Sequence, residues 1–569
     1  MPNKSSKIIS FPLSFFSIIF IIAILTGIFL RFYNLSWGAP YFFHADERNI
    51  ANSVTQLSYP SQMNPHFFAY GTLPIYSIYF TGVLTNLIQN LLFNAGVNIT
   101  SVSFEDSIII GRSFSFILSI LLVFLIYHIG ERLGGKTSGM ISATLASLSV
   151  GFIQYAHFAT FEIWLSFFTL LLSYMLMNYL STLKENYLLY SGGIMGILMA
   201  IKVSSLAFLP IAIFVILITS VRKDIKVKQK KIIILEKIFL RLLIFLSISV
   251  LIVYIVCPYF WLDSAGFLHS INYESSVGLG TLPVFYTQGF LGSIPITFQL
   301  TKVYPFILNP FVLITWLILL PLLIKELFKH KKTSLLILCG FLITAFFSQA
   351  FLYVKWVRYY IPTLAFIYVI MGYLLNLIIS KKYFSRINIG SGIFIFLFTV
   401  SLIYSLAYFK SVLYNKDTRL SAAQWADKNI SNNSPILSEL YDMGIVPFNP
   451  YFSSITLFDF YALDTDPQAK HKLKVMLNSS DYLILPGQRV IEPRINNKKY
   501  FPTGSPFYQS LLSGTDNFKM VYKSSCDIFC KILYLGSPSF SYEQTANVFD
   551  RPEVYIFKND KKENPRYQK

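Results

Sequence analysis

Charged residues are scarce in this sequence. Of 569 residues, only 13% are charged, while 54% are hydrophobic and 17% are aromatic, and the mean hydropathy is positive. This balance excludes an ordinary soluble protein, because the single core of a soluble protein does not need so many apolar residues. Apolar runs at 15–30, 108–129 and 238–257 are long enough to cross about 30 Å of hydrocarbon at ~20 residues per helix. We therefore predict a polytopic α-helical membrane protein.

Several other features are missing. No small-residue cleavage site follows the first apolar run, so we disfavour a signal peptide; residues 31–37 instead have the composition of an aromatic interface belt. There is no fixed-period repeat and no low-complexity tract, which argues against a solenoid or a disordered tail. The net charge of +19 does not require nucleic acid, because much of it lies in short loops where Lys and Arg mark the cytoplasmic side.

Cysteine is also rare, with four residues. Cys257 and Cys339 fall in apolar runs and are predicted to be core residues. Cys526 and Cys530 are plausible partners in a small disulfide loop if that part of the chain is extracytoplasmic. A zinc site would need two further ligands, and none stands nearby at the usual spacing.

Basic clusters orient the apolar runs. When every cluster is placed in the cytoplasm, one path of about eleven transmembrane helices results, with the N-terminus inside and the C-terminal domain outside a plasma (inner) membrane. The predicted spans are 12–30, 108–129, 138–157, 162–181, 188–201, 203–220, 238–257, 305–324, 333–351, 359–379 and 391–409.

Two long external loops follow from this path, at 31–107 and 258–304. The apolar segment 72–93 does not fit the parity as a span. Its prolines and amides suit one or two helices in the outer interface, and a re-entrant hairpin is the alternative.

The composition changes after the last span, which divides the chain into a transmembrane domain at 1–410 and a soluble domain at 411–569. Residues 417–429 predict a helix, and 436–440, 482–485 and 554–557 predict short buried strands between turns. We expect a small α/β extracytoplasmic domain.

Ionisable residues near the outer ends of the spans are the candidates for function, because charge beside hydrocarbon is costly and usually functional. Asp46 and Glu47 lie in an aromatic loop. Such a pair offers one group to accept a proton and another to hold a hydroxyl or a metal. The alternative is a solvated loop, or Asp46 as the N-cap of a helix.

The other candidates lie at later span ends. Glu162 is flanked by apolar and aromatic residues, with a structural ion pair to another span as the alternative. Lys202 interrupts an apolar run and suits a phosphate, unless it extends to the headgroups. Lys355 and Arg358, three apart, are predicted to share a helical face beside aromatics. Arg112 begins the second span. Convergence of these groups would bind a lipid-linked phosphate beside an activated nucleophile.

Taken together, these residues resemble a known pattern. The chain is similar to the membrane-embedded C-type glycosyltransferases (the GT-C fold), and within them to the protein O-mannosyltransferase and aminoarabinose-transferase superfamily. The resemblance rests on the Asp46–Glu47 pair, the stretch 111–135, the acidic residue at 162, the Gly-rich run ending at Lys202, and the stretch 358–362. It covers most of 12–380. The second acidic position is usually Asp in such enzymes, and here it is Glu162.

The resemblance implies inverting transfer of a monosaccharide from a polyprenyl-phosphate carrier to an acceptor protein, lipid or glycan on the outer face. Asp46 would be the general base, Glu47 would assist it, and Glu162 would complete the acidic site. Lys202 and Arg358, with Lys355 or Arg112, would hold the donor phosphate. A divalent cation is possible, with Asp46, Glu47 and Glu162 as ligands, but no ligand spacing demands one.

Two alternatives from other classes stay open. A transporter or lipid-carrier flippase would place its charges near the bilayer midplane and often shows internal repeats, and a non-catalytic assembly subunit would not need the acidic site. The residues do not identify the sugar or the acceptor.

Overall fold

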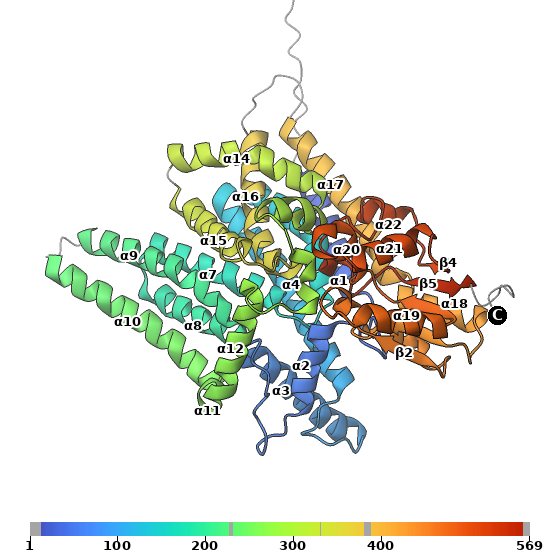
Figure 1. Cartoon of the computed structure of the whole chain (residues 1–569). Helices are drawn as coiled ribbons and strands as arrows, with labels where there is room; N and C mark the ends of the chain where they lie inside the picture. Colours follow the sequence, from blue (N-terminus) through green and yellow to red (C-terminus); the bar gives the residue numbers. More distant parts are fainter. Residues whose placement is uncertain (1–12, 227–230, 331, 381–388, 561–569) are drawn as a thin grey trace, which may run out of the picture.

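A computed structural model describes residues 13–226, 231–330, 332–380 and 389–560. Its first part is a bundle of long helices and its last part is a small domain with one sheet, which lies beside the bundle next to α17 (Figure 1). Both parts of the predicted fold class are therefore present.

Within the described residues, nine helices are long and apolar enough to cross a membrane, or up to ten when one bent pair is counted as a span. The chain is thus a multi-pass membrane protein. The long helices, given with the short helices that continue them, are α1 (Leu13–Phe32), α4 (Phe104–Gly134), α7 (Glu162–Thr182), η1 (Val203–Phe208) with α9 (Leu209–Lys226), α10 (Lys231–Val256), α14 (Pro310–His330), α15 (Thr333–Ala350), η4 (Val357–Tyr360) with α16 (Ile361–Ser380), and α17 (Ile389–Tyr408) with η5 (Phe409–Tyr414).

Two of the eleven predicted spans have unusual forms. The span predicted at 138–157 is the bent pair α5 (Lys136–Ser147) and α6 (Val150–Ala156), whose axes differ by 59°. The span predicted at 188–201 is α8 (Glu185–Ile201), whose 17 residues reach only about 26 Å at 1.5 Å per residue. It packs between α7 and α10.

The span predicted near 305–324 starts later in the structure. The span predicted from residue 305 begins at Pro310, because α13 (Tyr304–Ile307) is a separate short helix and Asn309 adopts a positive φ of 69° that ends it. A left-handed residue cannot continue a right-handed helix.

Both predicted external loops contain helices. The first holds α2 (Ala45–Thr55) and α3 (Thr72–Phe93), so the segment 72–93 is one helix and is not among the candidate spans. The second holds α11 (Tyr259–Leu262), α12 (Ser264–Leu279), η2 (Phe285–Phe290) and η3 (Gln299–Val303). Figure 1 shows α2, α3, α11 and α12 at one end of the bundle.

The bundle core is centred on α16, which is buried all round from Ile361 to Leu375. A helix that is apolar on every face is stable only when other helices surround it. α5, α7, α4 and α15 pack against it, and this fixes the position of η4, which leads directly into α16.

The C-terminal domain contains a five-stranded mixed sheet in the order β2-β1-β3-β5-β4. β1 is parallel to β2 and β3, and β5 is antiparallel to β3 and β4. The strands are β1 (Ile436–Glu439), β2 (Ile455–Phe458), β3 (Tyr482–Leu485), β4 (Phe518–Lys523) and β5 (Tyr555–Asn559), so three were predicted and β2 and β4 were missed.

Helices complete this domain. They are α18 (Thr418–Asn429), η6 (Met443–Phe448), η7 (Phe460–Asp464), α19 (Ala469–Ser479), α20 (Ile491–Asn496), η8 (Lys498–Tyr500), α21 (Gly504–Ser513), α22 (Ile528–Leu533) and η9 (Gln544–Ala546). The predicted helix at 417–429 is α18. The predicted disulfide between Cys526 and Cys530 is present, and Cys257 and Cys339 are buried.

The domain is bonded to the bundle by buried polar contacts. Asp550 accepts hydrogen bonds from Gln154 of α6 and Tyr408 of α17, each at 2.9 Å. Lys302 of η3 donates to the carbonyl oxygen of Phe540 at 2.6 Å. Because leaving these buried polar groups unpaired would be costly, the hydrogen bonds hold the domain in one position against the bundle.

Candidate active site

Asp46 and Arg358 form an ion pair between α2 and η4, the short helix that leads into α16. Asp46 lies in the first turn of α2, whose N-cap is His44, so Asp46 does not cap this helix. Arg358 stacks on Trp356 at 4.5 Å from the ring centre and lies 5.8 Å from that of Tyr359. The pair joins segments separated by 312 positions.

The charge of Arg358 dominates the chemistry of Asp46. Burial alone raises the pKa of the Asp46 carboxyl, but nearby cations, chiefly Arg358, outweigh burial and hold this pKa below its usual 3.8. Asp46 is therefore a carboxylate at neutral pH and, while paired, a weak base.

A small cavity lies beside this pair. Glu162, Lys202 and Arg358 line it, together with Tyr359, Gln349 and several small side chains. These charged residues come from α7, the break between α8 and η1, and η4. The structure thus brings together four of the predicted site residues, three in the wall and Asp46 bonded to one of them.

Lys202 is held between two tyrosines. The chain is extended at Lys202, with φ of −158°, which breaks the run of helices. Its Nζ lies 5.3 Å from the ring centre of Tyr70 and 5.2 Å from that of Tyr359. Such rings attract a cation without neutralising it. Lys202 therefore lines the cavity with its ammonium group between two rings. That it binds a phosphate stays a prediction.

Glu162 is buried at the first turn of α7. Its Oε2 has no hydrogen-bond partner among the described residues, and no ion pair to Glu162 is found within that part of the chain. The structural ion pair considered as its alternative is thus not formed. A buried polar atom left unpaired at a cavity wall is one that a ligand could satisfy.

Glu47 and Arg112 are bonded to each other away from this cavity. Arg112 Nε and Nη2 donate to the two carboxylate oxygens at 2.8 and 2.6 Å, and both side chains are fully buried. Arg112 Nη1 donates to the carbonyl oxygens of Leu35 and Trp37, while Glu47 also accepts the N–H of Ala159 at 2.6 Å. This arrangement favours a positioning role, in which the pair fixes α2 and hence Asp46, over the roles predicted from the sequence.

Lys355 does not share a helical face with Arg358, which corrects the prediction. Residues 353–356 are not helical, and only Val357–Tyr360 forms a 3-10 turn. Lys355 is buried and donates to Ser293 Oγ and the carbonyl oxygen of Tyr353, each at 3.0 Å. It does not line the cavity.

Gly71, in the segment 31–107, contacts the end of α8. Its N–H donates to the carbonyl oxygen of Ile201 at 2.8 Å. A Cβ at this position would lie 1.9 Å from the carbonyl oxygen of Ala200, so no other residue fits without displacing the backbone. This close approach sets Tyr70 against Lys202.

Sequence reasoning missed three residues of this site. Tyr70 Oη lies 3.5 Å from Arg358 Nη1 and accepts from it. Glu274 of α12 is within electrostatic range of Lys202 and Arg358. Arg489, from the segment after β3, is one of the cations that lower the pKa of Asp46. All three belong to loops or polar segments whose position only the tertiary structure supplies.

A divalent cation stays a prediction. Among the described residues, no group of three or more His, Cys, Asp or Glu side chains is arranged to hold a metal ion. The oxygens of Asp46 and Glu47 are bonded to arginines, so these ligands would have to leave their partners first.

Comparison with known families identifies part of the chain. Residues 92–252, which include Arg112, Glu162 and Lys202, match the family described as dolichyl-phosphate-mannose-protein mannosyltransferase. The match spans less than half of the chain. Over that segment it confirms the resemblance to membrane-embedded glycosyltransferases. No curated protein sequence matches the chain.

Solved structures align with this chain over different shares of its length. The Archaeoglobus fulgidus oligosaccharyltransferase in the apo form aligns over 96% of this chain and 89% of its own, with 11% identity and a TM-score of 0.46. ArnT from Cupriavidus metallidurans bound to undecaprenyl phosphate aligns over 96% and 98%, with 11% identity and a TM-score of 0.43. The S. cerevisiae Pmt1-Pmt2 complex bound to the sugar donor aligns over 46% and 35%, with 14% identity and a TM-score of 0.34.

Proposed function

We propose that this chain transfers a monosaccharide from a polyprenyl-phosphate carrier to an acceptor protein, lipid or glycan. The observation that carries this proposal is the cavity in which Lys202 and Arg358 stand beside Glu162, with Asp46 bonded to Arg358. The family match over residues 92–252 supports the donor class.

In this proposal, the donor phosphate binds Lys202 and Arg358. Two cations near one phosphate stabilise the negative charge that grows on it as the bond to the sugar breaks. The acceptor oxygen attacks the anomeric carbon, its proton passes to Asp46, and the polyprenyl phosphate leaves with the electron pair of the broken bond. A single displacement inverts the anomeric carbon.

The Asp46–Arg358 pair adds a coupling between donor binding and base strength. Without donor, Arg358 holds Asp46 as a weak base. A phosphate that engages Arg358 removes part of this stabilisation, and the pKa of Asp46 then rises because burial dominates. The base is therefore strongest when the donor is in place.

The basic clusters of Lys and Arg between the apolar runs also predict how the chain is oriented in the membrane. We propose that the cavity and the C-terminal domain face the non-cytoplasmic side of the inner membrane, with the N-terminus inside. Fusions of alkaline phosphatase after residue 560 and within the segment 222–237 test this: activity at the first position and none at the second is expected, and the reverse contradicts it.

The test of function uses full-length protein in lipid nanodiscs with a panel of polyprenyl-phosphate sugars, and it measures free polyprenyl phosphate. Release that disappears in Asp46→Asn and falls strongly in Lys202→Met is expected, with water as a slow acceptor. No release from any donor, or equal release by all variants, contradicts the proposal. Movement of labelled donor across proteoliposomes without any release would favour transport.

A further inference from the structure

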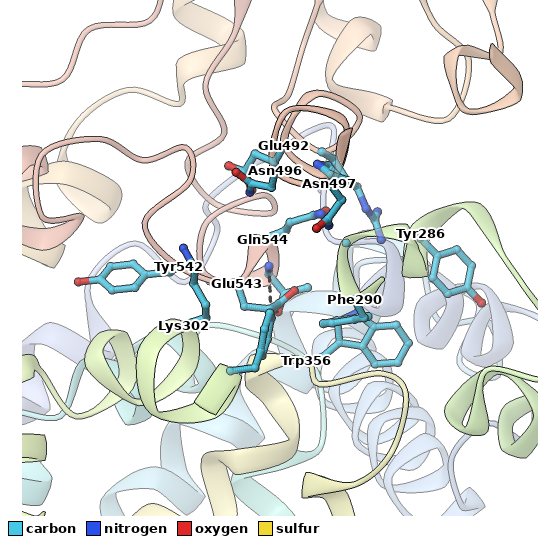
Figure 2. A pocket seen from close by; sticks show the side chains of 15 residues that line it. Tyr286, Phe290, Lys302, Trp356, Glu492, Asn496, Asn497, Tyr542, Glu543 and Gln544 are labelled. Atoms are coloured by element: carbon cyan, nitrogen blue, oxygen red, sulfur yellow. Dashed lines mark hydrogen bonds between the residues drawn. The ribbon is translucent and has the colours of Figure 1, made fainter. Parts of the chain in front are cut away.

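A polar cavity of about 300 Å³, the Arg551 cavity, lies where the C-terminal domain joins the span formed by α17 and η5. Its walls come from η5 and α18, from β4 and the segment that follows β4, and from Arg551. Ligand pockets commonly begin at about this volume. The cavity at the contact between the domain and the bundle, drawn in Figure 2 around Glu543 and Gln544, is much smaller, at about 50 Å³.

The lining of the Arg551 cavity favours an anion. Its charged side chains are two cations, Lys416 and Arg551, and one carboxylate, Asp527. Asp527 already accepts the N–H of Cys530 at 2.9 Å. The other lining residues, apart from Tyr522, carry small hydroxyl or amide groups, and they are Ser411, Asn415, Thr418, Ser421, Ser524 and Ser525.

Arg551 is buried but only partly hydrogen-bonded. Its Nη2 donates to the carbonyl oxygen of Ser525 at 2.6 Å. Its Nε and Nη1 have no hydrogen-bond partner among the described residues, and neither has the buried hydroxyl of Ser411. Buried polar groups in native proteins are nearly always paired, and a guanidinium forms strong charge-assisted bonds with phosphate oxygens. These groups therefore indicate an oxyanion such as phosphate.

The cavity lies at the depth of lipid headgroups. α17 and η5 form one candidate span over Ile389–Tyr414, and Ser411 belongs to its last turns. Aromatic side chains surround this end of the span: Tyr414 is exposed, and the rings of Tyr33 and Phe409 lie 5.0 Å apart. Such side chains are typical of the interface between hydrocarbon and water. A phosphate in the cavity would thus be level with the phosphates of the surrounding lipids.

α22 places an apolar surface beside the cavity. It packs against α17 (Figure 1), and Tyr404 of α17 donates to the carbonyl oxygen of Leu533 at 2.8 Å. Asp527, which lines the cavity, is the N-cap of this helix. On α22 and just after it, four large apolar side chains are exposed: Ile528, Phe529, Ile532 and Leu535. An exposed apolar group of this kind next to a span suits contact with hydrocarbon.

We propose that the Arg551 cavity binds the phosphate of an anionic phospholipid from the leaflet on the domain's side, with the acyl chains against α22. The phosphate accepts from Arg551 and Ser411, and Lys416 at the exposed rim adds attraction. Free phosphate has the same headgroup chemistry but covers none of the apolar residues of α22, so the lipid accounts for both observations. This proposal is independent of the transfer reaction.

The site is tested by fluorescence quenching in the full-length protein. Ile532→Cys, on α22, is labelled with a maleimide fluorophore, because the native cysteines are buried or disulfide-bonded. The protein in detergent micelles is titrated with phosphatidylglycerol brominated on its acyl chains, and separately with phosphatidylcholine brominated in the same way. Lys474→Cys, on the exposed face of α19, carries the control label.

Phosphatidylglycerol should quench the label at residue 532 at a lower lipid fraction than phosphatidylcholine and leave the label at residue 474 unchanged. Arg551→Gln should weaken the apparent affinity for phosphatidylglycerol about tenfold or more, because a charge-assisted bond is lost. Lys416→Gln, at an exposed position, should weaken it about two- to fivefold and decides the test if Arg551→Gln does not fold. Lys470→Gln, on the exposed face of α19, removes the same charge and should change nothing.

Three results would overturn the proposal. Equal affinity for the two lipids, or full affinity in the folded Arg551→Gln and Lys416→Gln variants, removes the headgroup site. Absence of quenching at residue 532 removes the contact between α22 and the acyl chains. Inorganic phosphate should not displace the brominated lipid; displacement that Arg551→Gln abolishes would assign free phosphate to the cavity in place of a lipid.

Discussion

Glu543 of the C-terminal domain accepts the backbone N–H of Val357 at 3.1 Å, one residue before Arg358. It also accepts the N–H of Thr545 at 3.2 Å and the hydroxyl of Thr545. Burial raises the pKa of this carboxyl, and the three hydrogen bonds oppose that rise. The domain therefore fixes the start of η4, although none of its residues lines the cavity beside Asp46 and Arg358.

We expect Glu543→Ala to lower kcat by about 10- to 100-fold, because a small displacement of Arg358 is costly in a positioned site. Glu543→Gln keeps an acceptor oxygen and should recover most of the rate. Asp427→Ala, on an exposed part of α18, serves as the control. Steady-state kinetics for donor release give kcat and KM separately; a change in acceptor KM alone would contradict the positioning role.

The Asp46–Arg358 pair predicts a pH profile. Because the pKa of Asp46 without donor lies below 3.8, kcat/KM for the donor, which reports the donor-free protein, should persist as the pH falls from about 8 to about 5. Arg358→Gln removes the main opposing charge, so burial raises this pKa and the residual rate should fall at a higher pH than in the wild type. Asp46→Asn should lose about 10²- to 10⁴-fold at every pH. An identical acid limb in wild type and Arg358→Gln would contradict this.

The position of Lys202 predicts that removing its charge weakens donor binding. Lys202→Met should raise KM for the donor about 10-fold or more, because a charge-assisted bond to phosphate is lost, and Lys202→Arg should recover part of it. Tyr70→Phe keeps the ring beside Lys202 and should leave this KM near the wild-type value. Equal donor KM in wild type and Lys202→Met, measured in folded protein, would exclude Lys202 as a phosphate ligand.

The Glu47–Arg112 pair predicts a stability effect. Removing one partner of a buried pair costs about 3–5 kcal/mol, so Glu47→Gln and Arg112→Met should each lower the apparent melting temperature in detergent. Glu47→Met combined with Arg112→Met should lose less than the sum. Donor KM in this double variant tests the role predicted from the sequence: an increase comparable to that of Lys202→Met would assign Arg112 to the phosphate after all.

Glu439, at the end of β1, predicts that stability depends on pH. Burial, with Asp442 and Asp459 adding to it, raises its pKa from 4.5 to about 8. The folded chain then binds a proton more tightly than the unfolded chain, so stability is full below about pH 4.5 and is lost as the pH rises toward about 8. Glu439→Gln should recover on the order of 4 kcal/mol at pH 8 and little at pH 4.5. An equal melting temperature of variant and wild type at both pH values would exclude this.

The order of the spans could be predicted because each is a continuous apolar run separated by basic residues. The break at Asn309 could not, since its positive φ has no signal in the local apolar pattern. β2 and β4 were missed because they are mostly exposed, whereas β1 and β3, which were predicted as short buried strands, are buried along almost their whole length.

The candidate site could be predicted only as a set of residues. Charge in an apolar context identified Asp46, Glu162, Lys202 and Arg358, and their roles stay predictions. Which charges pair could not be predicted, because Arg112 and Glu47 meet through the packing of α4 against α2. Arg489 lies in a polar segment of the C-terminal domain, where a cation is no sign of function. Only the packing of the domain against the bundle brings it near Asp46.

The contact of Gly71 with the end of α8 constrains biogenesis. During synthesis the segment 31–107 leaves the ribosome long before residue 201. The N–H of Gly71 then has no carbonyl oxygen to bind until α8 is inserted. Arg358 follows later still, and Glu543 last of all. The contacts that join Asp46, Lys202, Arg358 and Glu543 therefore form only after residue 543 has been synthesised.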